Sequence, residues 1–277
     1  MGNVKLDEIG DWSEIKLNIL KEYKKAYSTI IAAQPAIRKH IYIDGFSGPG
    51  VHISKRTGEC VSGSPLNALN IEPPFDEFHF IDLDGDKANL LRSVTRNLKN
   101  VYVYEGDCND VLLQKVFPGA KYIDYHRALC FLDPYKMDPN WKVVQTAGQM
   151  ESIEIFLNFP VMDMNRNVLW RNPEKVDTSQ LARMNAFWGD DSWRNIAYKK
   201  TKGLFGDIEE KAGIEPVVKA YQSRLKKVAG FTYVPESIPM RNSKGAIIYY
   251  LFFASPNKTG AKIVKDIFDK YRDKGIT

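Results

Sequence analysis

The stretch from residue 41 to residue 50 constrains the fold more than any other part of the sequence. It begins as a β-branched apolar run, reaches an acid at Asp44 and continues through a loop that contains Gly45, Gly48 and Gly50. Such a run predicts a buried strand, and glycines directly after it allow a tight turn or a close approach to a ligand. An acid at the end of a first strand, followed by a glycine loop, commonly holds the charged end of a nucleotide-like cofactor. We therefore predict an α/β fold with a ligand at this turn.

The loop does not match the common phosphate-binding patterns. Neither G-x-x-x-x-G-K-[ST] nor G-x-G-x-x-G occurs here. Asp44 would also repel a pyrophosphate, and it suits a cationic group instead, such as the amino group of an amino-acid moiety. The alternative is a glycine loop in an unrelated α/β protein.

Length and composition exclude several classes of protein. A chain of 277 residues suits one large domain or a domain with an insertion. No apolar run reaches the roughly 18 residues of a membrane-spanning helix, and the polar, acidic N-terminus has no signal-peptide core. Cys60, Cys108 and Cys130 fit neither a disulfide framework nor a zinc ribbon, so we expect a reducing, cytoplasmic setting. The four histidines have no metal-ligand spacing, and we predict no metal. A net charge of +5 permits a nucleic-acid partner.

Acids also end the second predicted strand, over 77–84. We expect Asp82 to accept both hydrogen bonds from a ribose diol, with Asp84 as the alternative. Either acid could instead cap the helix that starts at 85, a role that suits Asp84 and Asp86 better.

Polar residues follow the third and fourth predicted strands as well. The third strand, over 101–104, leads to Asp107, which could equally be an ordinary turn residue. The fourth, over 128–132, leads directly to Asp133-Pro134-Tyr135, which could also be only a strand-terminal turn. Because the carboxyl ends of parallel strands meet at one edge of a sheet, these residues are expected close to the glycine loop.

The other segments predict helices around the sheet and a final hairpin. The predicted helices cover 11–33, 65–71, a segment from 85, 141–150, 216–230 and 258–274. The remaining predicted strands cover 153–160, 231–234 and 247–253, with a turn at 240–245. In the first helix, Lys16, Lys21, Lys24 and Lys25 lie mostly off the apolar stripe. They predict a solvated face, or alternatively a nucleic-acid contact.

Residues 161–206 differ from the rest of the chain because tryptophan, phenylalanine and methionine alternate there with arginine and lysine. We predict a helical insertion over the carboxyl ends of the strands. Its aromatic and cationic side chains could stack bases and neutralise phosphates. They could also form a small satellite core with solvated cations.

Taken together, these motifs resemble those of the class I S-adenosylmethionine-dependent methyltransferases. Asp44 to Gly50 is similar to their motif I, and Asp133-Pro134-Tyr135 is similar to the D/N-P-P-Y/F motif of amino-group methyltransferases, with one proline missing. The resemblance covers roughly 36–160 and 215–275. It implies a Rossmann-like fold with a seven-stranded, mostly parallel sheet and an antiparallel C-terminal hairpin.

The resemblance also implies a role for each matching position. S-adenosylmethionine, with S-adenosylhomocysteine as its product, would be held by Asp44, Gly45, Phe46, Gly48, Gly50, Asp82, Asp107 and Cys108. The catalytic residues would be Asp133, Pro134 and Tyr135. Asp133 and the Pro134 carbonyl would accept from the target amine, and Tyr135 would stack on a flat base. Further substrate contacts are assigned to Lys136, Trp141 and Arg166.

The chain resembles the bacterial three-Cys-motif partner family (TcmP) more closely still. The matching features are the helix from Lys16 to Tyr23, the glycine loop, Gly63-Ser64-Pro65-Leu66, and Asp133-Pro134-Tyr135 followed by Trp141. The residue after Tyr135 is Lys136, where the family usually has glycine. This resemblance spans nearly the whole chain and implies a companion protein that carries a three-cysteine motif.

The leading hypothesis is therefore a methyltransferase that acts on an exocyclic amino group of a nucleobase in DNA or RNA. One alternative is a non-catalytic or cofactor-binding subunit of a three-Cys-motif protein, and another is a small-molecule methyltransferase. We expect three parts: an N-terminal helix over 1–35, a methyltransferase core over 36–160 and 207–277, and the insertion over 161–206, a candidate substrate lid.

Overall fold

The computed structural model describes residues 6–203 and 206–273, and its centre is a seven-stranded sheet in the order β11-β12-β8-β7-β2-β5-β6. The strands are β2 (Lys39–Asp44), β5 (Glu77–Asp82), β6 (Val101–Glu105), β7 (His126–Leu132), β8 (Ile153–Phe159), β11 (Ile238–Arg241) and β12 (Ile247–Ala254). The first five run parallel, β12 is antiparallel to β8, and β11 is antiparallel to β12. The predicted mostly parallel sheet with an antiparallel hairpin is confirmed.

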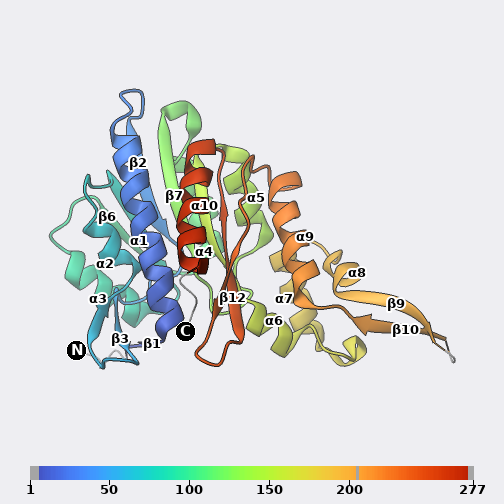
Figure 1. Ribbon diagram of the computed structural model, residues 1–277. Helices are drawn as coiled ribbons and strands as arrows, with labels where there is room; N and C mark the ends of the chain where they lie inside the picture. Colours follow the sequence, from blue (N-terminus) through green and yellow to red (C-terminus); the bar gives the residue numbers. More distant parts are fainter. Residues whose placement is uncertain (1–5, 204–205, 274–277) are drawn as a thin grey trace.

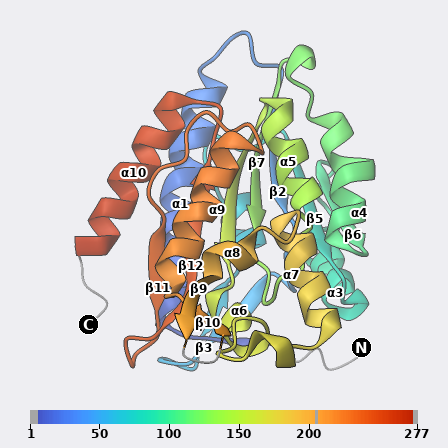
Figure 2. The same cartoon turned by 90° about the vertical axis from the view of Figure 1, so that its right-hand side faces the viewer.

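Helices cover both faces of the sheet (Figures 1 and 2). The α-helices are α1 (Asp11–Ala32), α2 (Ser64–Leu69), α3 (Gly85–Thr95), α4 (Cys108–Val111), α5 (Trp141–Met150), α6 (Val161–Asn167), α7 (Thr178–Trp188), α8 (Trp193–Ala197), α9 (Ile214–Lys227) and α10 (Lys258–Asp273). Short helical turns are η1 (Leu112–Val116), η2 (Phe117–Gly119), η3 (Tyr122–Asp124) and η4 (Pro173–Lys175). Figure 2 shows α1 and α10 on one side of the sheet and α5 and α7 on the other.

Burial on both faces explains why the strands read as nearly unbroken apolar runs. All seven residues of β8 are buried, and the last five of β7 are buried too. One apolar core lies between the sheet and α5, α7 and α9, and a second lies between the sheet and α1, α2 and α10. The carboxyl ends of β2, β5, β6, β7 and β8 meet at one edge of the sheet, where the glycine loop lies.

The predicted strand over 231–234 is wrong. Its apolar residues Phe231 and Val234 are buried in the core, but only Tyr233 makes an isolated bridge, to Ser255. The strand that pairs with β12 is β11, which includes Met240, a residue expected in the turn. The residues that pair with β12 are those directly before the tight turn at 242–245. The apolar pattern over 231–234 therefore indicated burial in the core and not pairing in the sheet.

A small sheet follows the glycine loop in the chain, and the sequence did not predict it. It consists of β1 (Glu8–Ile9), β3 (Val51–Ser54) and β4 (Cys60–Ser62), in the order β1-β3-β4. The segment over 51–59 was expected to be only a polar connection. Its strands are short and partly exposed, so they carry neither an apolar run nor a clear alternation.

The insertion is not entirely helical. After α6, α7 and α8 the chain forms a hairpin from β9 (Tyr198–Gly203) and β10 (Gly206–Lys211), which extends away from the sheet in Figure 1. The expected boundary between 206 and 207 therefore falls inside a hairpin. Strand β9 carries lysines and β10 carries acids, with few apolar residues in either, so the sequence showed no apolar period by which a strand could be recognised.

Candidate active site

The glycine loop begins where β2 lies between β7 and β5. The Gly45 amide donates to the Phe131 carbonyl at 2.9 Å, and a Cβ at Gly45 would lie 2.8 Å from Leu132 Cδ2. Gly48 and Gly50 have φ angles of +62° and +86°, in the left-handed region that favours glycine. The loop therefore needs glycine at Gly45 for close packing and at Gly48 and Gly50 for its backbone conformation.

Asp44, at the end of β2, is wholly buried beneath this loop. Ser64 Oγ donates to its carboxylate, as does the Phe46 amide at 3.2 Å. The buried Lys24 of α1 donates to the Ser64 carbonyl at 3.1 Å. Burial raises the pKa of Asp44 to about 6 and lowers that of Lys24 to about 7. The direct contact with a ligand that the sequence predicted for Asp44 does not fit this geometry, and the carboxylate instead fixes the loop from below.

Asp82, at the end of β5, faces the loop from the neighbouring strand. One of its oxygens accepts from the Gly48 amide and the other from the Asp84 amide, both at 2.8 Å. A carboxylate has about four acceptor positions, so two remain, and the side chain is partly exposed. Asp84 caps α3 by accepting from the amides of Asp86 and Lys87, the helix-capping role expected for it.

Asp107 is exposed at the end of β6 and caps α4. Its Oδ1 accepts from the amides of Asn109 and Asp110 at 2.9 Å and 3.3 Å. The Cys108 side chain is buried in the core, and burial raises the pKa of its thiol. Phe46 packs partly buried against the same core. The structure thus leaves Asp107 accessible beside the glycine loop's edge of the sheet, with the Cys108 thiol inside.

Asp133 stands at the end of β7 between two polar partners. Lys16 of α1 forms an ion pair with Oδ2, and Asn158 Nδ2 donates to Oδ1. Pro134 is buried, whereas the Tyr135 side chain is 76% exposed, with its hydroxyl 3.4 Å from Asp7 Oδ2. A partly exposed carboxylate therefore lies next to an aromatic side chain that is open to solvent.

Two neighbouring elements hold the loop over 133–140 in place. Asn109 of α4 accepts from the Asn140 amide at 2.7 Å and donates to the Asp138 carbonyl at 3.1 Å. Asp163 of α6 accepts from the Met137 amide at 3.1 Å. Because both side chains bond to backbone groups, they fix the path of the loop and thereby the position of Tyr135.

The role of α1 in the site was not predictable from its charge pattern alone. Lys16 and Lys24 are buried and face Asp133 and Asp44, so a solvated face is wrong for both of them, and it holds only for Lys21 and Lys25. Lys16 and Lys24 are eight residues apart, on the same ridge as the buried Leu20. This spacing of four residues could have indicated that both lysines face the core. The contact of Asn158 with Asp133 was also not predicted, and its position near the end of β8 was the only indication in the sequence.

The residues assigned to substrate contacts lie in different environments. Lys136 and Arg166 are exposed. Trp141 is buried, packs edge-on against Tyr221 and lies under the guanidinium of Arg224, 4.8 Å from its ring centre. Trp141 therefore has a packing role in this structure, and the substrate contact assigned to it stays a prediction.

Three aromatic residues of the insertion, Phe187, Trp188 and Trp193, belong to the main core, whereas Trp170 is 41% exposed. Phe187, Trp188 and Trp193 are all at most 2% exposed, so the satellite-core interpretation describes them better than base stacking. In the hairpin, Lys199, Lys200 and Lys202 are the register partners of acids. The three acids are Glu210, Glu209 and Asp207. The sequence of the hairpin therefore holds nearly as many acids as lysines.

Neither a metal cluster nor a membrane span is found in the described chain. Among residues 6–203 and 206–273, no three His, Cys, Asp or Glu side chains are placed to hold a metal ion. No helix in these ranges is both long and apolar enough to cross a bilayer.

Solved structures share the fold, while sequence comparison finds no relatives. No protein-family profile matches the chain, and neither does any curated protein. Protein LPL1258 from Legionella pneumophila, of the DUF519 family, aligns over 94% of this chain and 91% of its own length, with 15% identity and a TM-score of 0.53. An O-methyltransferase from Bacillus cereus, in complex with S-adenosylhomocysteine, aligns over 88% of this chain and 90% of its own, with 12% identity and a TM-score of 0.43.

A third neighbour is the methyltransferase domain of bacterial CtHen1, with 9% identity, coverage of 86% and 99%, and a TM-score of 0.40. Identities this low concern the fold alone. The strand order, with five parallel strands and an antiparallel hairpin, is the Rossmann-like arrangement that the sequence predicted, and LPL1258 shares this fold.

Proposed function

We propose that the protein is an S-adenosylmethionine-dependent methyltransferase that acts on an exocyclic amino group of a nucleobase in nucleic acid. The observation that carries this proposal is the meeting of three acidic positions at one edge of the sheet. Asp82, Asp107 and Asp133 follow β5, β6 and β7, and the exposed Tyr135 is next to Asp133.

The glycine loop after β2 and the acids that follow β5 and β6 fit the cofactor. The two remaining acceptor positions of Asp82 suit the two hydroxyls of a ribose, and the exposed Asp107 suits an exocyclic amine of adenine. The left-handed Gly48 and Gly50 let the backbone approach the ligand closely. When bound, the cofactor supplies an activated methyl group on a sulfonium.

Asp133 and the Pro134 carbonyl supply acceptors for the target amine. Each oxygen of Asp133 has one protein partner and retains a lone pair, so the carboxylate can accept a further hydrogen bond. Accepting both amine hydrogens aligns the nitrogen lone pair for in-line transfer, a step that needs positioning more than acid–base chemistry. Lys16 and Asn158 hold the carboxylate in that orientation.

A nucleobase suits the site because Tyr135 offers an open aromatic face beside these acceptors. Stacking on such a ring is worth about 1–3 kcal/mol per base. A base within a duplex would have to leave the helix, at a cost of a few kcal/mol.

We also propose that the chain belongs to the three-Cys-motif partner family, because of the residues from Lys16 to Tyr23 and the turn at Gly63-Ser64-Pro65-Leu66.

A specific contact favours a second candidate, a non-catalytic subunit of a three-Cys-motif protein. Lys16 and Asn158 already bond to both oxygens of Asp133, which would otherwise face the amine. In that case the protein would bind the cofactor or its partner without transferring a methyl group.

The variant Asp133→Ala distinguishes the methyltransferase from the non-catalytic subunit. We expect the variant to bind S-adenosylhomocysteine like the wild type but to lose methyl transfer to nucleic acid, measured with radiolabelled S-adenosylmethionine on total RNA and on genomic DNA. Lys21→Ala, at an exposed position of α1, is the matched control. Transfer by Asp133→Ala at the wild-type rate would contradict the assignment of Asp133. A folded wild type that binds the cofactor but modifies neither nucleic acid would favour the second candidate.

A further inference from the structure

Strand β6 forms an open edge of the central sheet. It is the last strand in the sheet order, and within the described residues no strand pairs with its outer side. The Asn100 carbonyl accepts from Phe78 at 2.9 Å, and the Gly106 amide donates to Asp82 at 3.0 Å. Because backbone groups alternate in direction along a strand, the amides and carbonyls of Val101, Val103 and Glu105 point away from the sheet.

A groove of about 380 Å³ runs beside this edge. It is lined by Arg92 and Arg96 of the α3 region, by Leu98, and by the strand residues Val103 and Tyr102. Leu98 and Tyr102 are 44% and 43% exposed, so both offer apolar surface to an occupant of the groove. The groove thus combines open backbone groups, apolar side chains and two cations.

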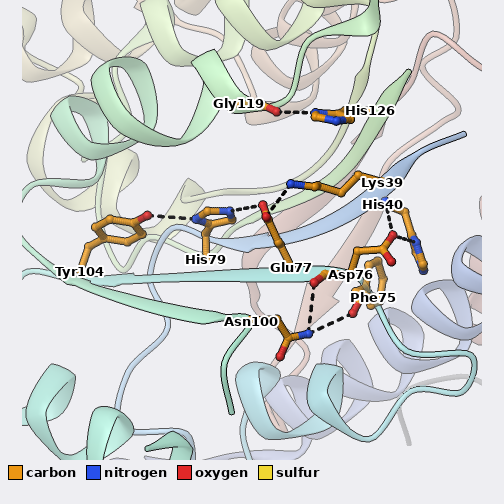
Figure 3. A network of polar contacts seen from close by, with 10 residues as sticks. All are labelled: Lys39, His40, Phe75, Asp76, Glu77, His79, Asn100, Tyr104, Gly119 and His126. Carbon is orange, nitrogen blue, oxygen red and sulfur yellow. Dashed lines mark hydrogen bonds and ion pairs between the residues drawn. The ribbon is translucent and has the colours of Figure 1, made fainter. Parts of the chain in front are cut away.

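A polar network packs against strand β6 on the sheet face that carries Tyr104 (Figure 3). The His79 ring stacks on Tyr102 and Tyr104, with centroid distances of 5.1 Å and 5.9 Å, and its Nδ1 lies 3.1 Å from the Tyr104 hydroxyl. Glu77 links His79 to Lys39. These contacts keep the edge ordered before any partner binds, which lowers the entropy cost of binding.

The charges at the groove favour an acidic occupant. Arg92 Nε donates to the outward Val103 carbonyl at 3.3 Å, so a cation stands at the middle of the open strand. The acid nearby is Glu105, 3.9 Å from Arg92. A second copy of the chain paired about the middle of β6 would place Arg92 against its own counterpart, and the like charges would repel.

The same features disfavour a nucleic-acid strand. One face of each tyrosine ring is already stacked on His79, so fewer ring faces are open to bases. A nucleic acid would also leave the outward amides of Val101, Val103 and Glu105 unused, whereas an extended peptide pairs with them.

We propose that β6 is a docking strand for an extended, acidic segment of a partner protein, which adds to the sheet as an eighth strand. The backbone of the segment pairs with the outward amides of Val101, Val103 and Glu105 and with the carbonyls of Val101 and Glu105, while Arg92 keeps its bond to the Val103 carbonyl. Its acidic side chains meet Arg92 and Arg96, and its apolar side chains cover Leu98 and Tyr102. This interaction is separate from the proposed methyl transfer and does not depend on it.

Selection from a phage library of random twelve-residue peptides tests this surface on the full chain. Selected peptides are synthesised, and their affinity is measured by fluorescence anisotropy. We expect them to carry net negative charge and to bind at least tenfold more weakly to Val103→Pro and to Arg92→Glu. Proline removes an outward amide without touching the ladder to β5, and Lys25→Glu on α1 is the matched charge-reversal control.

Hydrogen exchange gives a second readout that does not need a variant to fold. We expect an added peptide to protect the amides of Val101, Val103 and Glu105. Four results would overturn the proposal: selected peptides without net negative charge, equal binding to both variants, protection at other amides only, or displacement of the peptide by single-stranded RNA. A wild-type dimer that Val103→Pro dissociates would also overturn it, because a second copy would then occupy the edge.

Discussion

Two buried lysines make the N-terminal helix part of the site. Lys16 reaches Asp133, which we propose to be catalytic, and Lys24 lies beneath the glycine loop near Asp44. A buried polar group is costly unless it is partnered, and the ion pair of Lys16 ties α1 to the end of β7 while Lys24 ties it to the Ser64 carbonyl at the start of α2. The helix therefore fixes the geometry of both loops as well as covering the sheet.

A double-mutant cycle tests the pairing of Lys16 with Asp133. Removing one partner leaves the other charge partly buried, and we expect Lys16→Met and Asp133→Asn each to lower the free energy of unfolding by about 2–3 kcal/mol. The double variant should lose at least about 1 kcal/mol less than the sum of the single losses. Urea unfolding measures these values, and Lys21→Met is the control. Strictly additive losses would show that the pair is not coupled.

The acids at the strand ends were predictable from the sequence, but their partners were not. Asp82, Asp107 and Asp133 each follow a strand, and strand ends can be read from local apolar runs. Lys16 pairs with a residue 117 positions further along the chain, a contact that local patterns cannot reveal. The same limit explains Asp44, whose burial depends on α1 and α2.

Among the elements, β8 carries a buried acid away from the site. Glu154 accepts hydrogen bonds from Tyr23 and from Ser255 Oγ, and burial raises its pKa from 4.5 to about 7. The folded state thus favours the protonated form. Glu154 contributes stability that is fully present below pH 4.5 and is lost as the pH rises through 7.

Glu154→Gln should remove this pH dependence. A shift from 4.5 to about 7 corresponds to roughly 3 kcal/mol between the two ends of that range. We expect the difference in unfolding free energy between pH 4.5 and pH 8 to shrink by an amount of this order in the variant. Glu236→Gln, at an exposed position, should behave like the wild type. An unchanged pH profile for Glu154→Gln would show that the acid does not titrate in this range.

Element prediction succeeded where a segment is long and apolar, and failed where it is short and polar. The parallel strands and the helices α1, α5 and α10 were placed to within a few residues. The strands of the small sheet and of the hairpin β9–β10 were missed, because tertiary pairing and not local pattern makes them strands. The opposite error occurred over 231–234, where buried apolar residues predicted a strand and the strand is instead β11, at Ile238–Arg241.

At the scale of the whole molecule, the net charge of +5 is a weak guide to partners. The hairpin opposes three lysines with three acids, so its charges largely cancel. If nucleic acid is the substrate, its contacts should come from elsewhere on the surface, and its affinity should fall steeply with salt.

Shortening the hairpin tests its contribution. Tyr198 and Lys211 are register partners, so an Asn-Gly turn can replace residues 199–210. Tyr198 and Lys211 keep their bonds to the carbonyls of Trp170 and Leu169. We expect the free energy of unfolding to change by less than about 1 kcal/mol and nucleic-acid affinity to change by less than tenfold. A loss of binding with an intact fold would show that the hairpin contacts the nucleic acid.

Titration calorimetry with S-adenosylhomocysteine tests the proposed cofactor site most directly, with NAD and ATP as controls. We expect micromolar binding, about −8 kcal/mol, that is lost in Asp82→Ala and retained in Asp84→Ala. Binding that survives Asp82→Ala would place the cofactor elsewhere. No binding by a folded wild type would contradict the methyltransferase proposal itself.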